Sequence, residues 1–205
     1  MKQRHFSMLR DFHLADWFTL ANAFCGTGAI FAAMRFLQDG SVRDLLVGMA
    51  LIPLAFVFDA LDGRIARWRK VSSTLGRELD SLADVISFGV APAALGYACG
   101  LQGGWDWLIL SGFVGCGVSR LARYNVTAET LADGGDKVRY FEGTPIPTSV
   151  VIVGMLAWAA WRGDIGTDIW LGVVRLGPWQ LHPLALVFAL SGALMISKTL
   201  RIPKP

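Results

Sequence analysis

The chain has 205 residues, of which 54% are hydrophobic and only 17% are charged, so it is too apolar to be an ordinary soluble domain. The net charge of +3 is modest and no segment resembles a nucleic-acid-binding module, so nucleic acid is not an expected partner. The composition instead predicts one integral membrane domain over residues 1–205.

The first predicted element is a short helix within residues 1–15, which is expected to lie at the membrane interface. Six apolar segments follow, and each approaches the roughly 20 residues that a membrane-spanning helix needs. They lie at about residues 17–38, 43–63, 80–100, 105–122, 145–162 and 180–198. The predicted fold class is therefore all-α: a polytopic bundle of six transmembrane helices over residues 16–199, with a polar loop at residues 127–143.

Basic residues indicate the orientation of these spans. Lysines and arginines gather before the first span, between the second and third, between the fourth and fifth, and after the sixth. Since cytoplasmic loops carry the excess of positive charge, both termini are predicted on the cytoplasmic side of the cell (inner) membrane. The same positive charge suits anionic lipid headgroups and phosphates.

Four aspartates interrupt this apolar pattern at the cytoplasmic ends of the second and third spans. In the second span Asp59, Asp62, Gly63 and Ala66 follow the spacing i, i+3, i+4, i+7, which is one stripe of a helix. An ionisable side chain at membrane depth is costly enough to indicate a functional site. Two carboxylates and two small residues thus share a face.

The third span repeats the arrangement, with Gly76, Asp80 and Asp84 at i, i+4 and i+8. If the two helices are neighbours, four carboxylates converge and repel one another, and a divalent metal ion is the natural compensation. Oxygen ligands without His or Cys favour Mg²⁺ or Mn²⁺ over zinc. The cluster could hold one ion or two, and we expect two. Helix capping or pairing with nearby arginines would explain one or two of these aspartates, but not two matched stripes.

The small residues beside the carboxylates predict room for a ligand. Gly63, Ala66 and Gly76 leave the helix faces bare, so a phosphorylated group could approach the backbone. Arg67 follows one turn after Gly63, where its guanidinium could bind phosphate oxygens in a bidentate manner. The alternative interpretation of Arg67 is an ordinary arginine at the membrane interface.

The complete pattern Asp59-x2-Asp62-Gly63-x2-Ala66-Arg67-x8-Gly76-x3-Asp80-x3-Asp84 resembles the signature of the CDP-alcohol phosphotransferase family at every fixed position. This resemblance implies a six-helix membrane bundle, usually a homodimer, in which an acceptor hydroxyl displaces CMP from a CDP-linked lipid or alcohol. A narrower likeness, to the membrane-bound phosphatidylserine synthases, is carried by residues 78–92, 119–125 and 141–147. It implies that the substrates are CDP-diacylglycerol and L-serine and that membrane lipids surround the protein.

The resemblance also implies roles for individual residues. Asp84 would be the catalytic general base for the acceptor hydroxyl. The implied metal ligands are Asp59, Asp62 and Asp80, with Asp84 also close to the metal. The implied contacts to the CDP-lipid are Asp62, Gly63, Ala66, Arg67, Gly76 and Asp80.

Serine would bring a carboxylate and an ammonium group to the site. Arg120 and Arg123, three residues apart on one face at the end of the fourth span, are the candidates for its carboxylate, with Asn125 for a further polar contact. The two arginines could equally follow from the positive-inside rule. Thr19 and Asn22, polar at membrane depth, could face the nucleotide or bond to another helix.

Two other functions remain open at this point. The same chemistry could use glycerol phosphate, inositol phosphate or choline as the acceptor. A divalent-cation transporter could instead line a permeation path with the aspartates. The acidic cluster is single, lies towards one membrane face and has arginines beside it, which favours a phosphate-containing substrate over transport.

Overall fold

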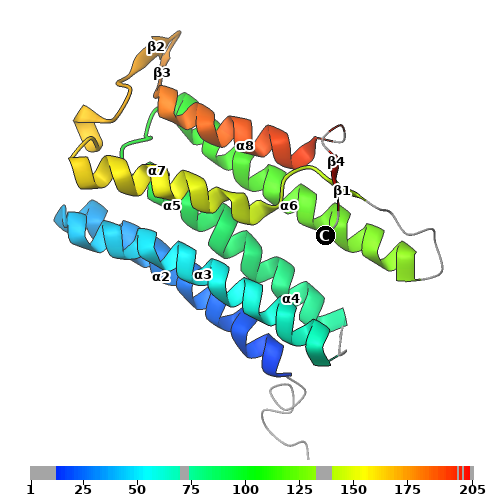
Figure 1. Cartoon of the computed structure of the whole chain (residues 1–205). Coiled ribbons are helices and arrows are strands. Elements are labelled where there is room, and N and C mark those ends of the chain that lie inside the picture. Colours follow the sequence, from blue (N-terminus) through cyan, green and yellow to red (C-terminus); the bar gives the residue numbers. More distant parts are fainter. Residues whose placement is uncertain (1–12, 70–73, 133–139, 198, 200, 204–205) are drawn as a thin grey trace, which may run out of the picture.

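The structure, a computed structural model, describes residues 13–69, 74–132, 140–197, 199 and 201–203. Almost all of it is helical (Figure 1). The main helices are α2 (Leu14–Asp39), α3 (Val42–Arg69), α4 (Thr74–Asp84), α5 (Ala91–Ala98), α6 (Gly104–Ala132), α7 (Ser149–Arg162) and α8 (Leu186–Ile196). A π-helical segment, Val85–Val90, joins α4 to α5, and short 3₁₀ turns at Ile146–Thr148, Gly166–Asp168 and Pro183–Ala185 precede or join helices.

Three helical stretches are long and apolar enough to cross a membrane: Leu14–Asp39, Val42–Ile65 and Leu75–Ala98. Two shorter apolar helices, Ile146–Arg162 and Pro183–Ile196, coincide with the fifth and sixth predicted spans. The expected apolar helical bundle is therefore confirmed, whereas the number of six spans stays a prediction. Most of the predicted interfacial helix falls in residues 1–12, outside the described part of the chain, and α2 already begins at Leu14.

Helices α2 and α3 form a tight antiparallel pair. Gly40 turns the chain between them in the left-handed conformation, φ 69°, and its N–H bonds to the carbonyl of Phe36 at 2.8 Å. Further along the pair, a methyl group on Gly48 would lie only 2.8 Å from Cβ of Ala32. Small residues let membrane helices approach closely, so this contact fixes α3 against α2.

The third span is a composite of α4, the π-helical segment and α5. Pro92 lies in the first turn of α5 and has no N–H to donate to the preceding turn, which interrupts the regular helical ladder. The wider π turn follows directly after Asp84, and there the N–H of Ala91 bonds to the carbonyl of Ile86. Such π segments recur at functional sites because they re-aim the residues around them.

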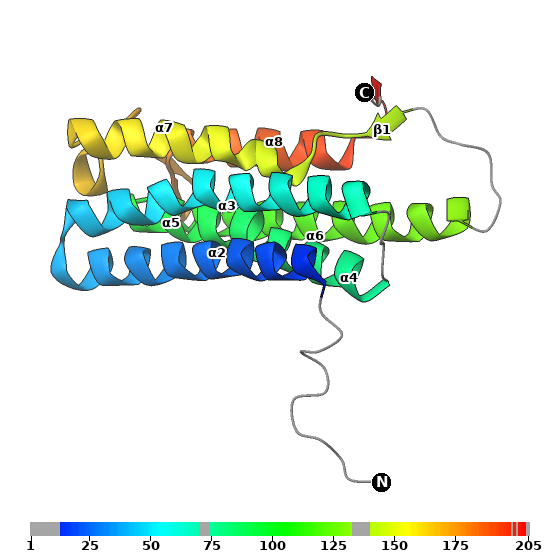
Figure 2. The ribbon, with the colours of Figure 1, turned by 60° about the horizontal axis from the view of Figure 1, so that its bottom comes forward.

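The described chain starts and finishes at one end of the bundle. The first turn of α2, the last turn of α3, the first turn of α4 and the strand β4 (Arg201–Pro203) all lie there (Figure 2). The aspartate-bearing turns of α3 and α4 therefore belong to this end. In Figure 2 α7 and α8 form one side of the bundle and α2 the other, with α3, α5 and α6 between them.

Two short antiparallel sheets modify the all-α expectation. Strand β1 (Tyr140–Glu142) pairs with β4, and β2 (Val174–Leu176) pairs with β3 (Trp179–Leu181). The loop predicted at residues 127–143 is wrong in part, because α6 continues to Ala132 and residues 140–142 form β1. The physical reason is that residues 128–132 include good helix formers, while β1 depends on a partner about sixty residues away in the chain.

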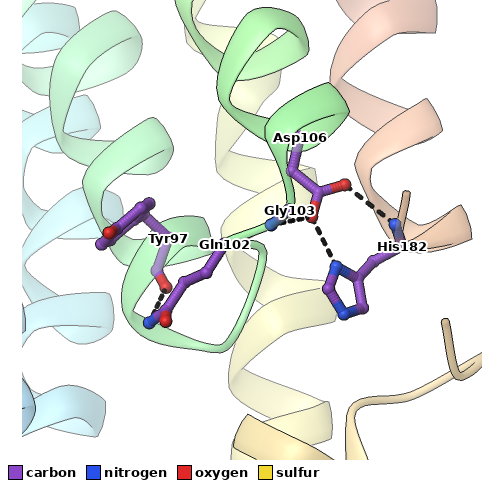
Figure 3. A network of polar contacts seen from close by, with 5 residues as sticks. All are labelled: Tyr97, Gln102, Gly103, Asp106 and His182. Atoms are coloured by element: carbon purple, nitrogen blue, oxygen red, sulfur yellow. Dashed lines mark hydrogen bonds and ion pairs between the residues drawn. The ribbon is translucent and has the colours of Figure 1, made fainter. Parts of the chain in front are cut away.

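At the opposite end of the bundle, the β2–β3 hairpin is tied to the start of α6 by a buried carboxylate. Asp106 accepts hydrogen bonds from the N–H of Gly103 at 2.8 Å and from the N–H of His182 at 2.9 Å. Its Oδ2 also contacts Nδ1 of His182 (Figure 3). Trp105 adds a bond from its ring N–H to the carbonyl of Leu176 at 2.9 Å.

Candidate active site

The predicted convergence of carboxylates is confirmed for three of the four aspartates. Oxygen atoms of Asp59 and Asp62 from α3 and of Asp80 from α4 lie within 4.8 Å of one another. Asp62 is buried, and the other two are half-buried. The helical stripes read from the sequence therefore do meet across the α3–α4 pair.

Asp84 lies one turn further into the bundle than Asp80. Its carboxylate is 7% exposed and interacts electrostatically with Asp59, Asp80 and Asp62. It is not part of the group within 4.8 Å that the described residues form, so its position differs from that of the other three. Asp84 is therefore close to the cluster but outside its tightest part.

Helix α2 supplies polar side chains that hold two of the carboxylates. The hydroxyl of Thr19 donates to Oδ2 of Asp62 at 2.7 Å, and Nδ2 of Asn22 donates to Oδ1 of Asp84 at 3.3 Å. Of the two roles that the sequence left open for Thr19 and Asn22, the structure shows the helix-to-helix hydrogen bond. The site is thus built from three helices rather than two.

The packing of α2 on the π-helical segment places Asn22. The hydroxyl of Ser87 donates to the backbone carbonyl of Asn22 at 2.8 Å. One turn along α2, Gly26 lies so close to this segment that an added Cβ would be 2.7 Å from Cα of Ser87. Only glycine allows this approach, and the approach brings Asn22 to Asp84.

The donor set fits a hard divalent cation. Within the described side chains no lysine or arginine forms an ion pair with the four aspartates. Oδ1 of Asp80 is buried and has no hydrogen-bond partner among the residues described. Buried carboxylate oxygens without partners are rare in folded proteins because desolvation penalises them, so this arrangement indicates a cation site. All of its ligands would be oxygen atoms, which suits Mg²⁺ or Mn²⁺.

The glycines proposed to face a ligand are placed beside the cluster. An added Cβ on Gly63 would meet no atom of the described part of the chain within 4 Å. Gly76 lies in the first turn of α4, one turn before Asp80. Ala66 and Arg67 lie on α3 by their backbone, but their side chains fall outside the described part, so their predicted roles are not tested.

The three residues proposed to bind the acceptor differ in their surroundings. Arg120 is half-buried, its Nε is buried without a partner among the described residues, and it interacts electrostatically with Asp84. Arg123 is exposed. The amide of Asn125 instead bridges helices, since its Nδ2 donates to Oγ of Ser81 at 3.0 Å and to Oε1 of Glu78 at 3.4 Å.

Residues 12–192 match the family described as CDP-alcohol phosphatidyltransferase. This chain belongs to that family. It is 46% identical over 206 residues to the CDP-diacylglycerol–serine O-phosphatidyltransferase of Saccharomyces cerevisiae, an alignment that covers 99% of this chain and 75% of the yeast protein.

Two further relatives are less similar to this chain than the yeast protein is, and both are longer than this chain. A protein of the same name from Mycobacterium bovis is 37% identical over 154 residues, covering 74% of this chain and 52% of the relative. The archaetidylserine synthase of Methanothermobacter thermautotrophicus is 37% identical over 147 residues, covering 68% and 55%. This chain therefore spans about half the length of these two relatives and three quarters of the yeast protein.

Two features of this CDP-alcohol phosphatidyltransferase were not found by sequence reasoning. Asp16 is buried in the first turn of α2, accepts the N–H of His13 at 2.7 Å and interacts electrostatically with Asp62. An acidic residue in the first turn of an apolar helix is the signal that could have found it. The link from Asn125 to Ser81 had no such signal, because it depends on how α4 packs on α6.

Proposed function

We propose that this protein transfers the phosphatidyl group of CDP-diacylglycerol to the hydroxyl of L-serine and releases CMP, as a CDP-diacylglycerol–serine O-phosphatidyltransferase. The observation that carries the proposal is the meeting of Asp59, Asp62 and Asp80 within 4.8 Å at one end of an apolar bundle. The acceptor assignment is supported by the 46% identity to the yeast serine enzyme. The names of the mycobacterial and archaeal relatives also specify serine or a serine lipid.

In this proposal Asp59, Asp62 and Asp80 hold divalent cations, two ions of Mg²⁺ or Mn²⁺, with Asp84 at the edge of the site. Bound cations would neutralise charge on the diphosphate and on the departing CMP. Thr19 fixes the carboxylate of Asp62 through its hydrogen bond of 2.7 Å. Such outer hydrogen bonds orient ligating groups before the substrate arrives.

Asp84 removes the proton of the acceptor hydroxyl. A serine hydroxyl is a weak nucleophile until its proton is taken, and Asp84 is a buried carboxylate beside the cluster. Asn22 holds one oxygen of Asp84, which leaves the other oxygen for the hydroxyl. The attack falls on the lipid-side phosphorus, in line with the bond to CMP.

The CDP-lipid lies against the small residues of α3 and α4, namely Gly63, Ala66 and Gly76, with Asp62 and Asp80 beside it. The open space at Gly63 supports this placement. Arg67 is proposed to bind the diphosphate. On the acceptor side, Arg120 and Arg123 are proposed for the carboxylate of serine, with Asn125 nearby; the electrostatic link from Arg120 to Asp84 supports Arg120 most directly.

The proposed setting is the cytoplasmic face of the inner membrane, with six spans, both termini on the cytoplasmic side and a homodimer as the assembly. Two facts support the proposal that the termini and the aspartates lie on the same, cytoplasmic side. The first described turn of α2 and strand β4 share the end that carries the aspartates (Figure 2). Basic residues also concentrate in the loops that the sequence assigns to this end.

The experiment that tests the proposal is CMP release by the purified, chelator-treated protein in the presence of CDP-diacylglycerol. Serine, glycerol 3-phosphate, inositol phosphate and choline are offered separately, each with and without added Mg²⁺ or Mn²⁺. We expect metal-dependent release with serine alone. Release with another acceptor would overturn the serine assignment. No release with any acceptor would contradict the proposed function and reopen both the choice of donor and the transporter hypothesis.

Asp84→Asn tests the role of the general base. We expect turnover to fall at least about a hundredfold, because an amide cannot take the proton. Binding of CDP-diacylglycerol should remain, since the three-carboxylate group is intact. Turnover measured by CMP release and lipid binding measured by thermal shift check the two parts; near-normal turnover would contradict the assignment.

A further inference from the structure

Two residues that interact with Asp84 each carry a buried polar atom without a hydrogen-bond partner among the described residues: Oδ1 of Asn22 and Nε of Arg120. Asn22 is fully buried and is bonded to Asp84 through its other amide atom. Arg120 reaches Asp84 electrostatically. One of these atoms can only accept a hydrogen bond and the other can only donate one.

The orientation of the Asn22 amide follows from its partner. Asp84 Oδ1 is an acceptor when the carboxylate is ionised, so the amide must present Nδ2 to it. Oδ1 of Asn22 is then turned away from that bond and needs a donor. The backbone carbonyl of the same residue already accepts from Ser87. A buried amide oxygen without a donor is destabilising, so its retention beside Asp84 indicates a ligand that donates to it.

We infer that Oδ1 of Asn22 accepts a hydrogen bond from the ammonium group of the acceptor, while Nε of Arg120 donates to its carboxylate. This assignment rests on the proposed function, since it takes Asp84 as the group that receives the hydroxyl. In a β-hydroxy-α-amino acid the hydroxyl and the ammonium lie on adjacent carbons. A hydroxyl on Asp84 therefore brings the ammonium to the residue bonded to that same carboxylate.

The chemistry of the donor lipid favours the ammonium of the acceptor over the other groups that could approach Oδ1 of Asn22. The diphosphate of the donor lipid is acceptor-only, so it has nothing to donate to Oδ1. The cytosine amine and the ribose hydroxyls of that lipid can donate, but they are neutral, whereas the ammonium also brings a positive charge to Asp84. Asp84, the carboxylate to which Asn22 is bonded and which lies outside the three-carboxylate group, also favours a positive charge beside it. Asn22 thus selects acceptors that carry an amine next to the hydroxyl, and Arg120 selects those that also carry a carboxylate.

The test compares Asn22→Leu with the unchanged full-length protein in the CMP-release assay. The KM for L-serine is measured together with the inhibition constant of 3-hydroxypropionate, which keeps the hydroxyl and carboxylate but lacks the ammonium. We expect the KM for serine to rise about tenfold or more while the inhibition constant of 3-hydroxypropionate changes less than about twofold. An equal rise in both, or no rise in either, would overturn the inference.

Thr19→Val is the matched control, because it removes a hydrogen bond from the same helix to a different carboxylate, Asp62. Thr19→Val should change the KM for serine and the inhibition constant of 3-hydroxypropionate by the same factor.

If Asn22→Leu does not fold, Asn22→Asp replaces it. The acceptor oxygen is retained in this variant, so discrimination between serine and 3-hydroxypropionate should persist, while turnover slows because the new carboxylate repels Asp84. Loss of discrimination in Asn22→Asp, or a rise confined to the KM for CDP-diacylglycerol in either variant, would overturn the inference.

The same experiment separates this inference from the proposed function. Absence of serine-dependent CMP release by the unchanged protein would contradict the function itself. Serine-dependent release with unaltered discrimination in the Asn22→Leu variant would leave the function standing and remove only the role of Asn22.

Discussion

Buried carboxylates occur at both ends of the bundle, but their surroundings differ. Asp106 is fully buried and receives two backbone N–H groups and the ring of His182 (Figure 3). At the other end Asp59, Asp62 and Asp80 crowd within 4.8 Å, and Asp80 keeps an oxygen with no partner among the described residues. A carboxylate satisfied by its own chain stabilises the fold, whereas a crowded and unsatisfied one is held ready for a ligand.

Glycines show the same difference between structural and functional positions. Gly26 lies against the backbone of Ser87, at a distance that leaves no room for a methyl group. Around Gly63 no atom of the described residues would lie within 4 Å of an added Cβ. The first glycine is needed so that α2 can approach the third span, and the second is proposed to leave room beside the carboxylates for a substrate.

The largest expected effect is that of Asp80→Asn on catalysis. Turnover should fall by about a hundredfold or more, because a negatively charged oxygen ligand is lost. Without metal, however, the variant should be at least as stable as the unchanged protein, since a buried unpaired charge is removed. CMP release and melting temperature, each with and without Mg²⁺, check this.

The opposite stability result would contradict the distinction between the carboxylates at the two ends of the bundle. A large loss of stability in the metal-free Asp80→Asn protein would mean that Asp80 is satisfied by the fold, as Asp106 is. Addition of Mg²⁺ serves as the internal control, because it should raise the melting temperature of the unchanged protein more than that of the variant.

The next effect in size concerns Asp106→Ala. The N–H groups of Gly103 and His182 would lose their partner, which should destabilise the protein by about 3–5 kcal/mol. The KM values for both substrates should hardly change, since the residue lies at the far end of the bundle. Denaturation in detergent and steady-state kinetics measure the two quantities; a changed KM with unchanged stability would assign Asp106 to function.

The smallest effects are expected for the glycine pair. Gly63→Ala should leave stability unchanged or raise it by up to about 1 kcal/mol, because alanine favours helix. It should nevertheless raise the KM for CDP-diacylglycerol. Gly26→Ala should lower stability by about 1–3 kcal/mol through overpacking against Ser87. If both variants shift the melting temperature and the KM for CDP-diacylglycerol by the same amounts, the distinction between the structural Gly26 and the ligand-facing Gly63 is wrong.

The parts that could be predicted from sequence are those set by helical spacing. The stripes of Asp59 with Asp62, and of Asp80 with Asp84, follow from chain geometry alone, and the convergence predicted from them is confirmed for Asp59, Asp62 and Asp80 but not for Asp84. The apolar segments likewise predicted the helices, because burial in lipid requires continuous hydrophobic runs. The local pattern therefore contained most of the site.

What could not be predicted depends on contacts between distant residues. The bond from Asn22 to Asp84 joins residues 62 apart in the chain, and that from His182 to Asp106 joins residues 76 apart. The π turn after Asp84 follows from packing against Gly26 as well as from Pro92, and only the proline is a local signal. The β1 strand similarly needed its partner β4.

The polar contacts of α2 also bear on how the chain is assembled during synthesis. Helix α2 precedes α3 and α4 in the chain, so Thr19 and Asn22 are already present when the acidic turns are made. Thr19 meets Asp62 once α3 is complete, and Asn22 meets Asp84 only after α4 and the π turn follow. Asp62 and Asp84 thus each find a partner on a helix that preceded them, so these two carboxylates are hydrogen-bonded as the bundle is assembled step by step.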